Sequence, residues 1–147
     1  MVKYTAKKSG VLKRVATFVN HPNTALQAFV CRDFDEDALE LSTFVDSSKL
    51  VNADFAGYYS FDLTNQVWFE EGESFYVVMK YFAPNENLPM PVESKIPKYA
   101  YPILQSGKCW INPDIKRWPN TWHACGADAE NPNLRFNLCI RVELISE

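Results

Sequence analysis

Cys109, His123 and Cys125 are the residues of this sequence whose types and spacing could support chemistry. They lie in the stretch SGKCWINPDIKRWPNTWHACG, residues 106–126, in which a tryptophan follows Cys109. A cysteine near a histidine can form a thiolate nucleophile that is activated by a base. Two cysteines and a histidine can instead bind zinc, and two cysteines can form a disulfide.

The surroundings of Cys109 disfavour a catalytic role. In papain-like enzymes the cysteine begins a long helix and the histidine lies far downstream. Here Pro113 follows closely, and a helix interior does not tolerate proline well; His123 lies only 14 residues after Cys109. The first cysteine of the papain-type local signature is also missing. We therefore expect this chain to have no enzyme activity of its own.

The same cysteines lack the short Cys-x-x-Cys pair that usually begins a structural zinc site, and Cys31 or Cys139 would have to complete the ligand set. We favour a disulfide between Cys109 and Cys125 across a β-hairpin, with free buried thiols as the alternative. The even number of cysteines, 4 in 147 residues, suits an extracellular, oxidising compartment.

Asp33, Asp35 and Asp37 have the spacing with which an EF-hand loop begins. The loop is not an EF-hand, because Ala38 stands where that motif has glycine and Phe44 where it has glutamate. A looser calcium site is the functional hypothesis for these carboxylates, and a solvated acidic turn is the alternative that we favour. We expect no other cofactor.

A period of two in hydrophobicity predicts that strands position these residues. The stretch LRFNLCIRVEL, residues 134–144, alternates apolar and polar side chains, which predicts a strand with one face in a core. Residues 75–82 alternate in the same way but are apolar on both faces, which predicts a central strand. Gly72, in EEGE, predicts a hairpin turn between residues 66–69 and this strand.

Other segments complete an all-β pattern. Strands are predicted over residues 11–19, 25–34 and 57–63, and one helical turn over residues 35–44. The prolines of residues 87–97 predict an edge strand or an extended crossing segment. Together these segments predict an antiparallel β-sandwich of about eight to ten strands, of the jelly-roll or carbohydrate-binding-module type, formed by residues 1–147 as a single domain.

Composition excludes several classes of partner. The net charge of −3, without a cluster of lysines and arginines, argues against nucleic-acid binding. No segment approaches the roughly 18 apolar residues that a membrane span needs. The N-terminal residues lack the apolar region of a signal peptide, and strand-like sequence begins directly after Met1. We expect a domain excised from a larger secreted or surface protein.

Seven segments carry a resemblance to a known family, in order along the chain. They are VLKRVATFV, LQAFVCRDF, FAGYYSFDL, EEGESFYVVMKY, MPVE, SGKCWINPDIKRW and NLCIRVEL. In this order they resemble the lectin-like domain that accompanies papain-type (C1) cysteine peptidases in bacteria and archaea. Two departures lie in loops, where specificity is normally set: Asp114-Ile115 replaces an Asp-Gly turn, and residues 119–133 form an extra segment.

The resemblance implies an antiparallel β-sandwich outside the cell or on its surface, with the peptidase active site in another domain. We expect a non-catalytic module that binds a glycan or cell-wall polymer, or that positions a linked C1 peptidase domain on such a polymer. The alternative is a structural domain that packs against the peptidase and has no sugar site.

Aromatic residues are concentrated between positions 99 and 122, namely Tyr99, Tyr101, Trp110, Trp118 and Trp122. Aromatic faces flanked by polar groups bind sugar rings, although a tryptophan of a sandwich more often fills the core. If a carbohydrate pocket exists, we expect Tyr99, Tyr101, Trp122 and His123 to form it, from loops over one end of the sandwich.

Overall fold

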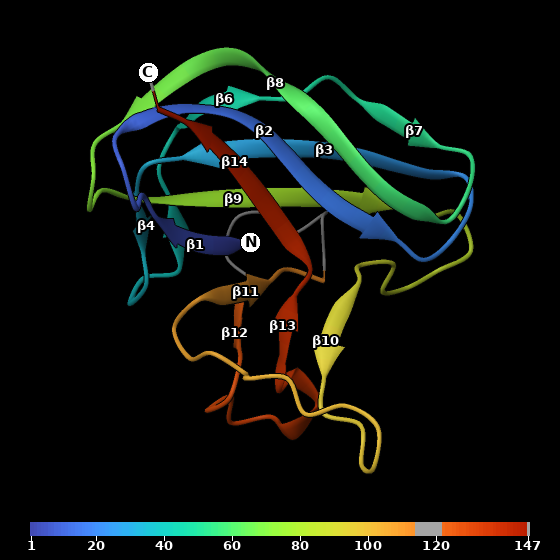
Figure 1. Ribbon diagram of the computed structural model, residues 1–147. Coiled ribbons are helices and arrows are strands. Elements are labelled where there is room, and N and C mark those ends of the chain that lie inside the picture. The colour runs from blue at the N-terminus through green and yellow to red at the C-terminus, as the bar shows by residue number, and fades with distance from the viewer. Residues whose placement is uncertain (114–121, 147) are drawn as a thin grey trace.

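The computed structural model describes residues 1–113 and 122–146, which form an all-β architecture of antiparallel sheets (Figure 1). The elements are β1 (Val2–Thr5), β2 (Gly10–Val19), β3 (Thr24–Cys31), β4 (Phe34–Asp35), β5 (Glu40–Leu41), β6 (Phe44–Ser47), β7 (Val51–Ala53), β8 (Gly57–Phe69), β9 (Ser74–Phe82), β10 (Val92–Ser94), β11 (Cys109–Ile111), β12 (His123–Cys125), the 3₁₀ turn η2 (Pro132–Leu134), β13 (Phe136–Leu138) and β14 (Ile140–Ile145). The predicted all-β fold is confirmed.

Two sheets form the sandwich. The larger has the order β12-β11-β1-β9-β3-β6, with β7 also paired to β3, and the smaller has the order β14-β2-β8. The main core lies between them, where Leu12 and Val15 of β2 belong to the same buried cluster as Val30 of β3 and Val77 of β9. Within the described residues these two sheets hold seven and three strands, in agreement with the predicted size of the sandwich.

β9 is the central strand that its sequence predicts, because it pairs with β1 on one side and β3 on the other. Its two faces belong to two different clusters of buried residues. Phe75, Val77 and Met79 belong to the core between the sheets. Tyr76 and Val78 belong to a second cluster, which the β4–β5 segment covers with Phe34, Leu39 and Leu41. Burial on both faces therefore explains why this strand lacks a polar face.

The predicted hairpin at Gly72 is wrong, because β8 and β9 lie in different sheets. Residues 57–63 and 66–69 form one long strand, β8, which pairs with β2 and changes register between Leu12 and Arg14 of that strand. The turn at Gly72 has a positive φ of 85° and carries the chain from one sheet to the other. Hydrogen bonds of Gly72 N to Ala6 O and of Ala6 N to Glu73 O, both 2.9 Å, hold it in place. The local turn signal is correct, but pairing depends on contacts remote in sequence.

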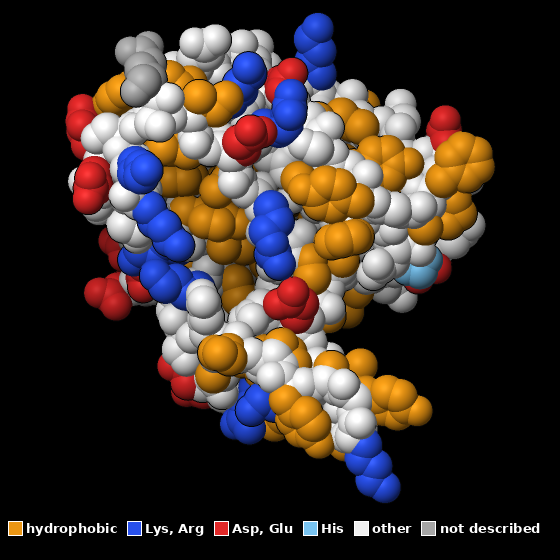
Figure 2. Space-filling model, viewed as in Figure 1, with side chains coloured by type: hydrophobic (Ala, Val, Ile, Leu, Met, Phe, Trp, Pro, Cys, Tyr) orange, Lys and Arg blue, Asp and Glu red, His pale blue; other side chains and the backbone are white. Residues whose placement is uncertain are grey.

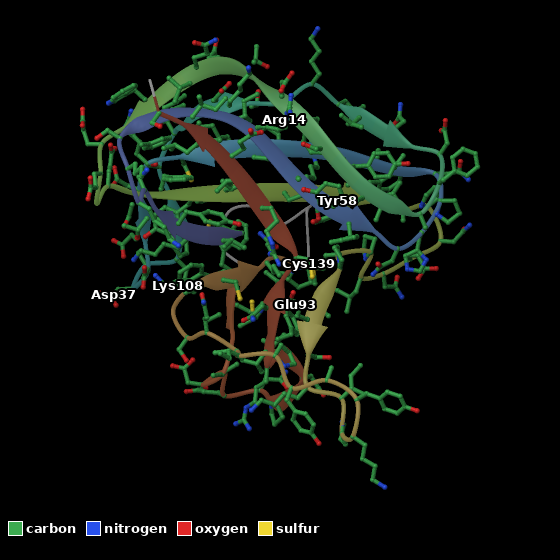
Figure 3. The ribbon with its side chains drawn as sticks, viewed as in Figure 1. Arg14, Asp37, Tyr58, Glu93, Lys108 and Cys139 are labelled. Carbon is green, nitrogen blue, oxygen red and sulfur yellow. The ribbon has the colours of Figure 1, made fainter. Side chains whose placement is uncertain are left out.

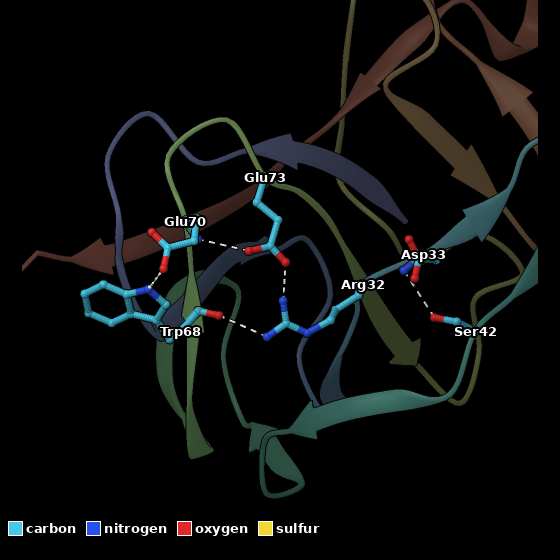
Figure 4. Close-up of polar contacts among 6 residues, drawn as sticks. All are labelled: Arg32, Asp33, Ser42, Trp68, Glu70 and Glu73. Carbon is cyan, nitrogen blue, oxygen red and sulfur yellow. Dashed lines mark hydrogen bonds and ion pairs between the residues drawn. The ribbon is translucent and has the colours of Figure 1, made fainter.

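Arg32, which directly follows β3, stabilises the turn that carries the chain from β8 to β9 (Figure 4). Its guanidinium pairs with Glu73, donates to the Trp68 carbonyl at 3.0 Å and lies 4.8 Å from the Phe69 ring centroid. The Trp68 indole N–H donates to Glu70 at 2.8 Å, and this bond, followed by one from Ser9, lowers the pKa of the Glu70 carboxyl. Hydrogen bonds to side chains therefore fix Trp68 and Glu70 immediately before the turn.

The predicted strand over residues 134–144 divides at Cys139. β13 pairs with β10, whereas β14 pairs with β2. The predicted faces are confirmed, since Phe136, Leu138 and Ile140 are buried. Two hydroxyl groups, that of the half-buried Tyr4 and that of the buried Thr17, hold the point where the strand changes partner. Tyr4 donates to the Ile140 carbonyl at 2.7 Å, and Thr17 to the Cys139 carbonyl at 2.9 Å. A strand keeps its alternation of buried and exposed side chains when it moves from one partner strand to another. Periodicity alone therefore does not reveal the division at Cys139.

The predicted helical turn over residues 35–44 is also wrong, since the segment contains the short hairpin of β4 and β5. The Asp35 carboxylate accepts hydrogen bonds from the main-chain N–H groups of Asp37 and Ala38, at 2.9 and 2.8 Å. Leu39 has a positive φ of 57°. An aspartate that bonds to main-chain groups two and three residues later stabilises a turn in place of a helix.

A distal lobe extends from one end of the sandwich, below it in Figure 1. We define this lobe as β10, β13, η2 and the connecting segments 95–107 and 126–135. Its proline-rich entry, residues 87–97, is extended and contributes β10 as an edge strand of a two-stranded sheet, as predicted. No helix in the described ranges has the length and apolar character that crossing a membrane requires.

Candidate functional site

A groove of about 710 Å³ in the distal lobe is the candidate functional site. One wall is β10, which pairs with β13 in the register Val92↔Leu138 and Ser94↔Phe136. Another wall is η2, where Asn131 caps the turn by accepting a hydrogen bond from Asn133 N at 3.0 Å. Pro132 follows the cap, and its fixed φ suits the first position of a helical turn. The sequence therefore builds both walls from short, locally determined elements.

Asn137 holds a third segment against these walls. Its side chain accepts a hydrogen bond from Gln105 N at 3.1 Å and donates one to the Ile103 carbonyl at 3.0 Å. Residues 103–105 are thereby held beside β13 although they are in no named strand. An asparagine side chain supplies both a donor and an acceptor, as a neighbouring strand would.

Gly126 allows two segments of the distal lobe to approach each other closely, at residues 105 and 126. Its φ is +130°, and a Cβ atom there would overlap the Gln105 carbonyl oxygen. Ala127 N donates to that oxygen at 3.3 Å, and Gly126 N donates to the Leu134 carbonyl at 3.0 Å. Only glycine fits this position without movement of the chain.

The groove combines apolar and polar lining groups. Its apolar part includes Leu88, Met90, Leu104 and Phe136, and its polar part consists of Ser94, Lys95, Asn133 and Arg135. Figure 2 shows hydrophobic side chains beside Lys and Arg side chains over the lower part of the molecule, where this lobe lies. An apolar lining with a few polar groups is the composition expected of a ligand site.

Tyr99 and Tyr101 lie on the loop between two groove-lining residues, Lys95 and Leu104. Tyr99 is 89% exposed and Tyr101 is 70% exposed. Two hydrogen bonds between Ile96 and Ala100 close the loop, and the Tyr101 hydroxyl accepts a bond from Lys98 N at 2.9 Å. The two rings are thus presented to solvent from a loop whose ends belong to the groove wall.

Comparison with known proteins identifies the family of the chain. The family described as "Lectin like domain" matches residues 3–141. The chain belongs to this family. No curated protein and no solved structure matches the chain. The predicted lectin-like character is therefore confirmed, whereas the association with C1 peptidases remains a prediction.

Trp122 does not occupy the position expected of a sugar platform in this lectin-like domain. It is only 4% exposed and belongs to the second core cluster, with its ring centroid 6.3 Å from that of Phe34. It also lines a second hollow, of about 530 Å³, which includes Phe44 and Pro113. Its burial under neighbouring aromatic rings leaves little of its surface to a ligand.

The four residues expected to form one pocket are in fact divided between different places. His123 is exposed on β12, where it stands opposite Ile111, and Trp122 is in the core. Only Tyr99 and Tyr101 are on the loop that adjoins the groove. Spacing along the chain could not reveal this division, because it depends on how β12 pairs. Trp118, the other tryptophan of that region, lies outside the described residues.

Cys109 and Cys125 are register partners on β11 and β12, as a hairpin requires. Both are buried free thiols, and their sulfur atoms are 2.8 Å apart. The thiol of Cys125 donates to the sulfur of Cys109, and this bond together with burial raises the pKa of Cys125. The pair is positioned for a disulfide, which remains a prediction for the oxidised protein.

The remaining cysteines lie apart from this pair. Burial, the largest cause, raises the pKa of Cys31 to about 12, so this thiol is protonated at neutral pH. Cys139 is half-buried at the junction of sandwich and lobe, near Glu93 (Figure 3). Within residues 1–113 and 122–146, no three His, Cys, Asp or Glu side chains are grouped so that they could hold a metal ion.

Asp33, Asp35 and Asp37, the residues of the calcium hypothesis, likewise form no metal-binding group in the described part of the chain. Main-chain N–H groups occupy one carboxylate oxygen of Asp35, as described above. The Asp33 main chain bonds to Ser42, with Asp33 N donating to the Ser42 hydroxyl at 3.2 Å. Asp37 is exposed in the turn between β4 and β5, at the lower left edge of the sandwich in Figure 3. The described contacts of this segment are those of a turn.

Sequence reasoning did not identify Lys95, Asn133 or Arg135 as site residues. They are single polar residues in a proline- and asparagine-rich context, without a motif. They meet because β10 pairs with β13, a contact between segments about 40 positions apart in the chain. The sequence signal near Lys95 is the pair Pro89 and Pro91, which predicts an extended segment or an edge strand at this position.

Proposed function

We propose that this lectin-like domain is a non-catalytic carbohydrate-binding module that recognises an extracellular or cell-surface polymer through its distal lobe. The observation that carries the proposal is the groove of about 710 Å³ together with the loop of Tyr99 and Tyr101, which begins and ends at groove-lining residues. Exposed tyrosine rings can pack against the C–H faces of sugars, and the groove supplies amide, hydroxyl and cationic donors for sugar oxygens.

A glycan array probed with the wild-type chain and with Tyr99→Ala/Tyr101→Ala tests this proposal. We expect the double variant to bind its glycans at least about tenfold more weakly, because each ring offers contact area that alanine lacks. The matched control is Phe55→Ala, since Phe55 is 76% exposed but lies between β7 and β8, outside the lobe. Absence of binding to every glycan, or equal losses in variant and control, would overturn the proposal.

A second candidate function is that of an interaction domain that packs against a papain-type peptidase domain. Large aliphatic residues of the lobe favour it, since Ile96 is 52% exposed and Ile103 is 87% exposed. Exposed apolar surface of this kind can mark a protein–protein interaction site. If this candidate is correct, the lobe shapes access to the peptidase and needs no glycan.

Co-purification with a separately produced papain-type catalytic domain distinguishes the two candidates. The interaction function predicts complex formation that Ile96→Ser/Ile103→Ser abolishes. Leu50→Ser is the control, because Leu50 is 62% exposed on the sandwich, between β6 and β7. A complex that survives in the double variant would exclude the lobe as the interface.

A further inference from the structure

The groove of the distal lobe has two charged lining residues, and both are cations. Lys95 and Arg135 line it together with Ser94, Asn133 and apolar side chains, and no Asp or Glu of the described chain is among the lining residues. Asp128 and Glu130 lie in the neighbouring turn and do not line the groove. The charge inside the groove is therefore positive, in a protein whose net charge is −3.

Arg135 differs from the other described arginines in its pairing. Arg14 pairs with Asp62 and Glu143, Arg32 with Glu73, and Arg141 with Glu93. Arg135 donates from Nε to the Ala129 main-chain carbonyl at 3.1 Å, and no carboxylate in the described part of the chain pairs with it. This bond orients the guanidinium group without neutralising its charge.

A guanidinium group held in this way is suited to an anion. Its planar set of N–H donors matches a carboxylate or a sulfate, and hydrogen bonds in which both groups are charged are among the strongest in proteins. The negative charge of the whole molecule opposes nonspecific attraction of polyanions. Binding of a polyanion would therefore depend on the local charge of the groove.

We propose that the groove recognises acidic carbohydrate, with Arg135 and Lys95 contacting a carboxylate or sulfate group of the sugar. Leu88, Met90 and Phe136 then contact the apolar faces of the same rings. This inference rests on the proposed carbohydrate-binding function and narrows its ligand to an anionic class. Neutral glycans would leave both cations without an anionic partner.

Matched pairs of glycans that differ only in charge test the inference. The array carries polygalacturonate and its fully methyl-esterified form, as well as a sulfated glycosaminoglycan and its desulfated form. We expect at least about tenfold tighter binding to the charged member of one pair, and a decline in that binding as salt rises. The pair that shows the preference tells whether the anionic group is a carboxylate or a sulfate.

Lys95→Gln/Arg135→Gln should abolish this preference for charged glycans. Lys13→Gln/Lys49→Gln is the control with the same change in net charge, because both lysines are exposed on the sandwich, and it should retain the preference. The melting temperature of each variant verifies that it is folded.

The outcomes separate the inference from the function on which it rests. Equal binding to charged and neutral members would overturn the acidic ligand and leave the carbohydrate-binding function standing. A preference for charged glycans that survives Lys95→Gln/Arg135→Gln would overturn the assignment to this groove. Absence of binding to any glycan would overturn the proposed function itself.

Discussion

The thiol of Cys125 lies 2.8 Å from the sulfur of Cys109, between register partners of two neighbouring strands. Oxidation by a small-molecule disulfide, such as oxidised glutathione, would convert the two thiols to one disulfide and yield two molecules of the reduced oxidant. Closure of a loop of this length is worth about 3 kcal/mol in the chain-entropy account. We expect the oxidised protein to melt about 10 °C higher than the reduced protein.

Thiol titration of the denatured, non-reduced protein checks this pairing. After refolding in a glutathione redox buffer we expect two reactive thiols, those of Cys31 and Cys139, and a disulfide-linked peptide pair detectable by mass spectrometry. Cys109→Ser/Cys125→Ser is the control, in which the melting temperature should not respond to the oxidant. Four reactive thiols in the refolded wild-type protein would contradict the prediction.

The acidic turn should need no cation for its stability. Main-chain N–H groups of Asp37 and Ala38 already satisfy the Asp35 carboxylate, at 2.9 and 2.8 Å. We expect EDTA to leave the melting temperature unchanged, whereas Asp35→Ala should cost about 1 kcal/mol through loss of these bonds. Differential scanning calorimetry measures both effects. A decline in melting temperature on chelation, reversed by added calcium, would instead reveal a bound ion.

Periodicity predicted the strands of this protein better than their partners. The alternation over residues 134–144 correctly gave the buried face of Phe136, Leu138 and Ile140. It could not show that the chain moves from β10 to β2 at Cys139, because both partners accept the same alternation. The turn at Gly72 was found but misinterpreted for the same reason: a turn has the same local chemistry within one sheet and between two sheets.

The candidate site was less predictable than the fold. Tyr99 and Tyr101 are exposed on a short loop, as their place among prolines and polar residues predicts. Trp122 was assigned to the site because it is close to them in sequence, yet the pairing of β12 with β11 places it in the core. Lys95 and Arg135 come together only through tertiary contacts, and no local pattern marks them.

Stability should fall at high pH because of Cys31. Burial raises its pKa from the ordinary value of 9.0 to about 12, so the native state holds this proton more tightly than the unfolded chain does. Its contribution is fully present below pH 9 and is lost as the pH rises towards 12. At pH 10 the loss is on the order of 1 kcal/mol relative to neutral pH.

Urea unfolding of wild-type protein and Cys31→Val at pH 7.5 and pH 10 measures this contribution. Both proteins keep the half-buried tyrosines, Tyr4 and Tyr81, whose pKa values are also raised by desolvation. The wild-type protein should therefore lose on the order of 1 kcal/mol more than the variant between the two pH values. Parallel losses in the two proteins would show that Cys31 does not contribute.

Gly126 should be the glycine whose replacement most disturbs the distal lobe. In Gly126→Ala the new methyl group meets the Gln105 carbonyl oxygen, and the backbone must also adopt a φ of +130°. Gly72→Ala is a suitable comparison, because Gly72 has a φ of +85° but no atom within 4 Å of the added Cβ. The comparison variant should lose about 1 kcal/mol through backbone strain alone.

Gly126→Ala should lose at least about 2 kcal/mol, since separating residues 105 and 126 also weakens the bonds from Ala127 N and Gly126 N. Hydrogen exchange locates the damage: the amides of Gln105 and Ala127 should exchange faster, while those of β9 are unchanged. Equal losses in the two variants would show that the close approach at Gly126 does not hold the groove wall in place. In that case the β10–β13 pairing and the bond from Arg135 Nε to the Ala129 carbonyl would suffice to hold Lys95 and Arg135 in place.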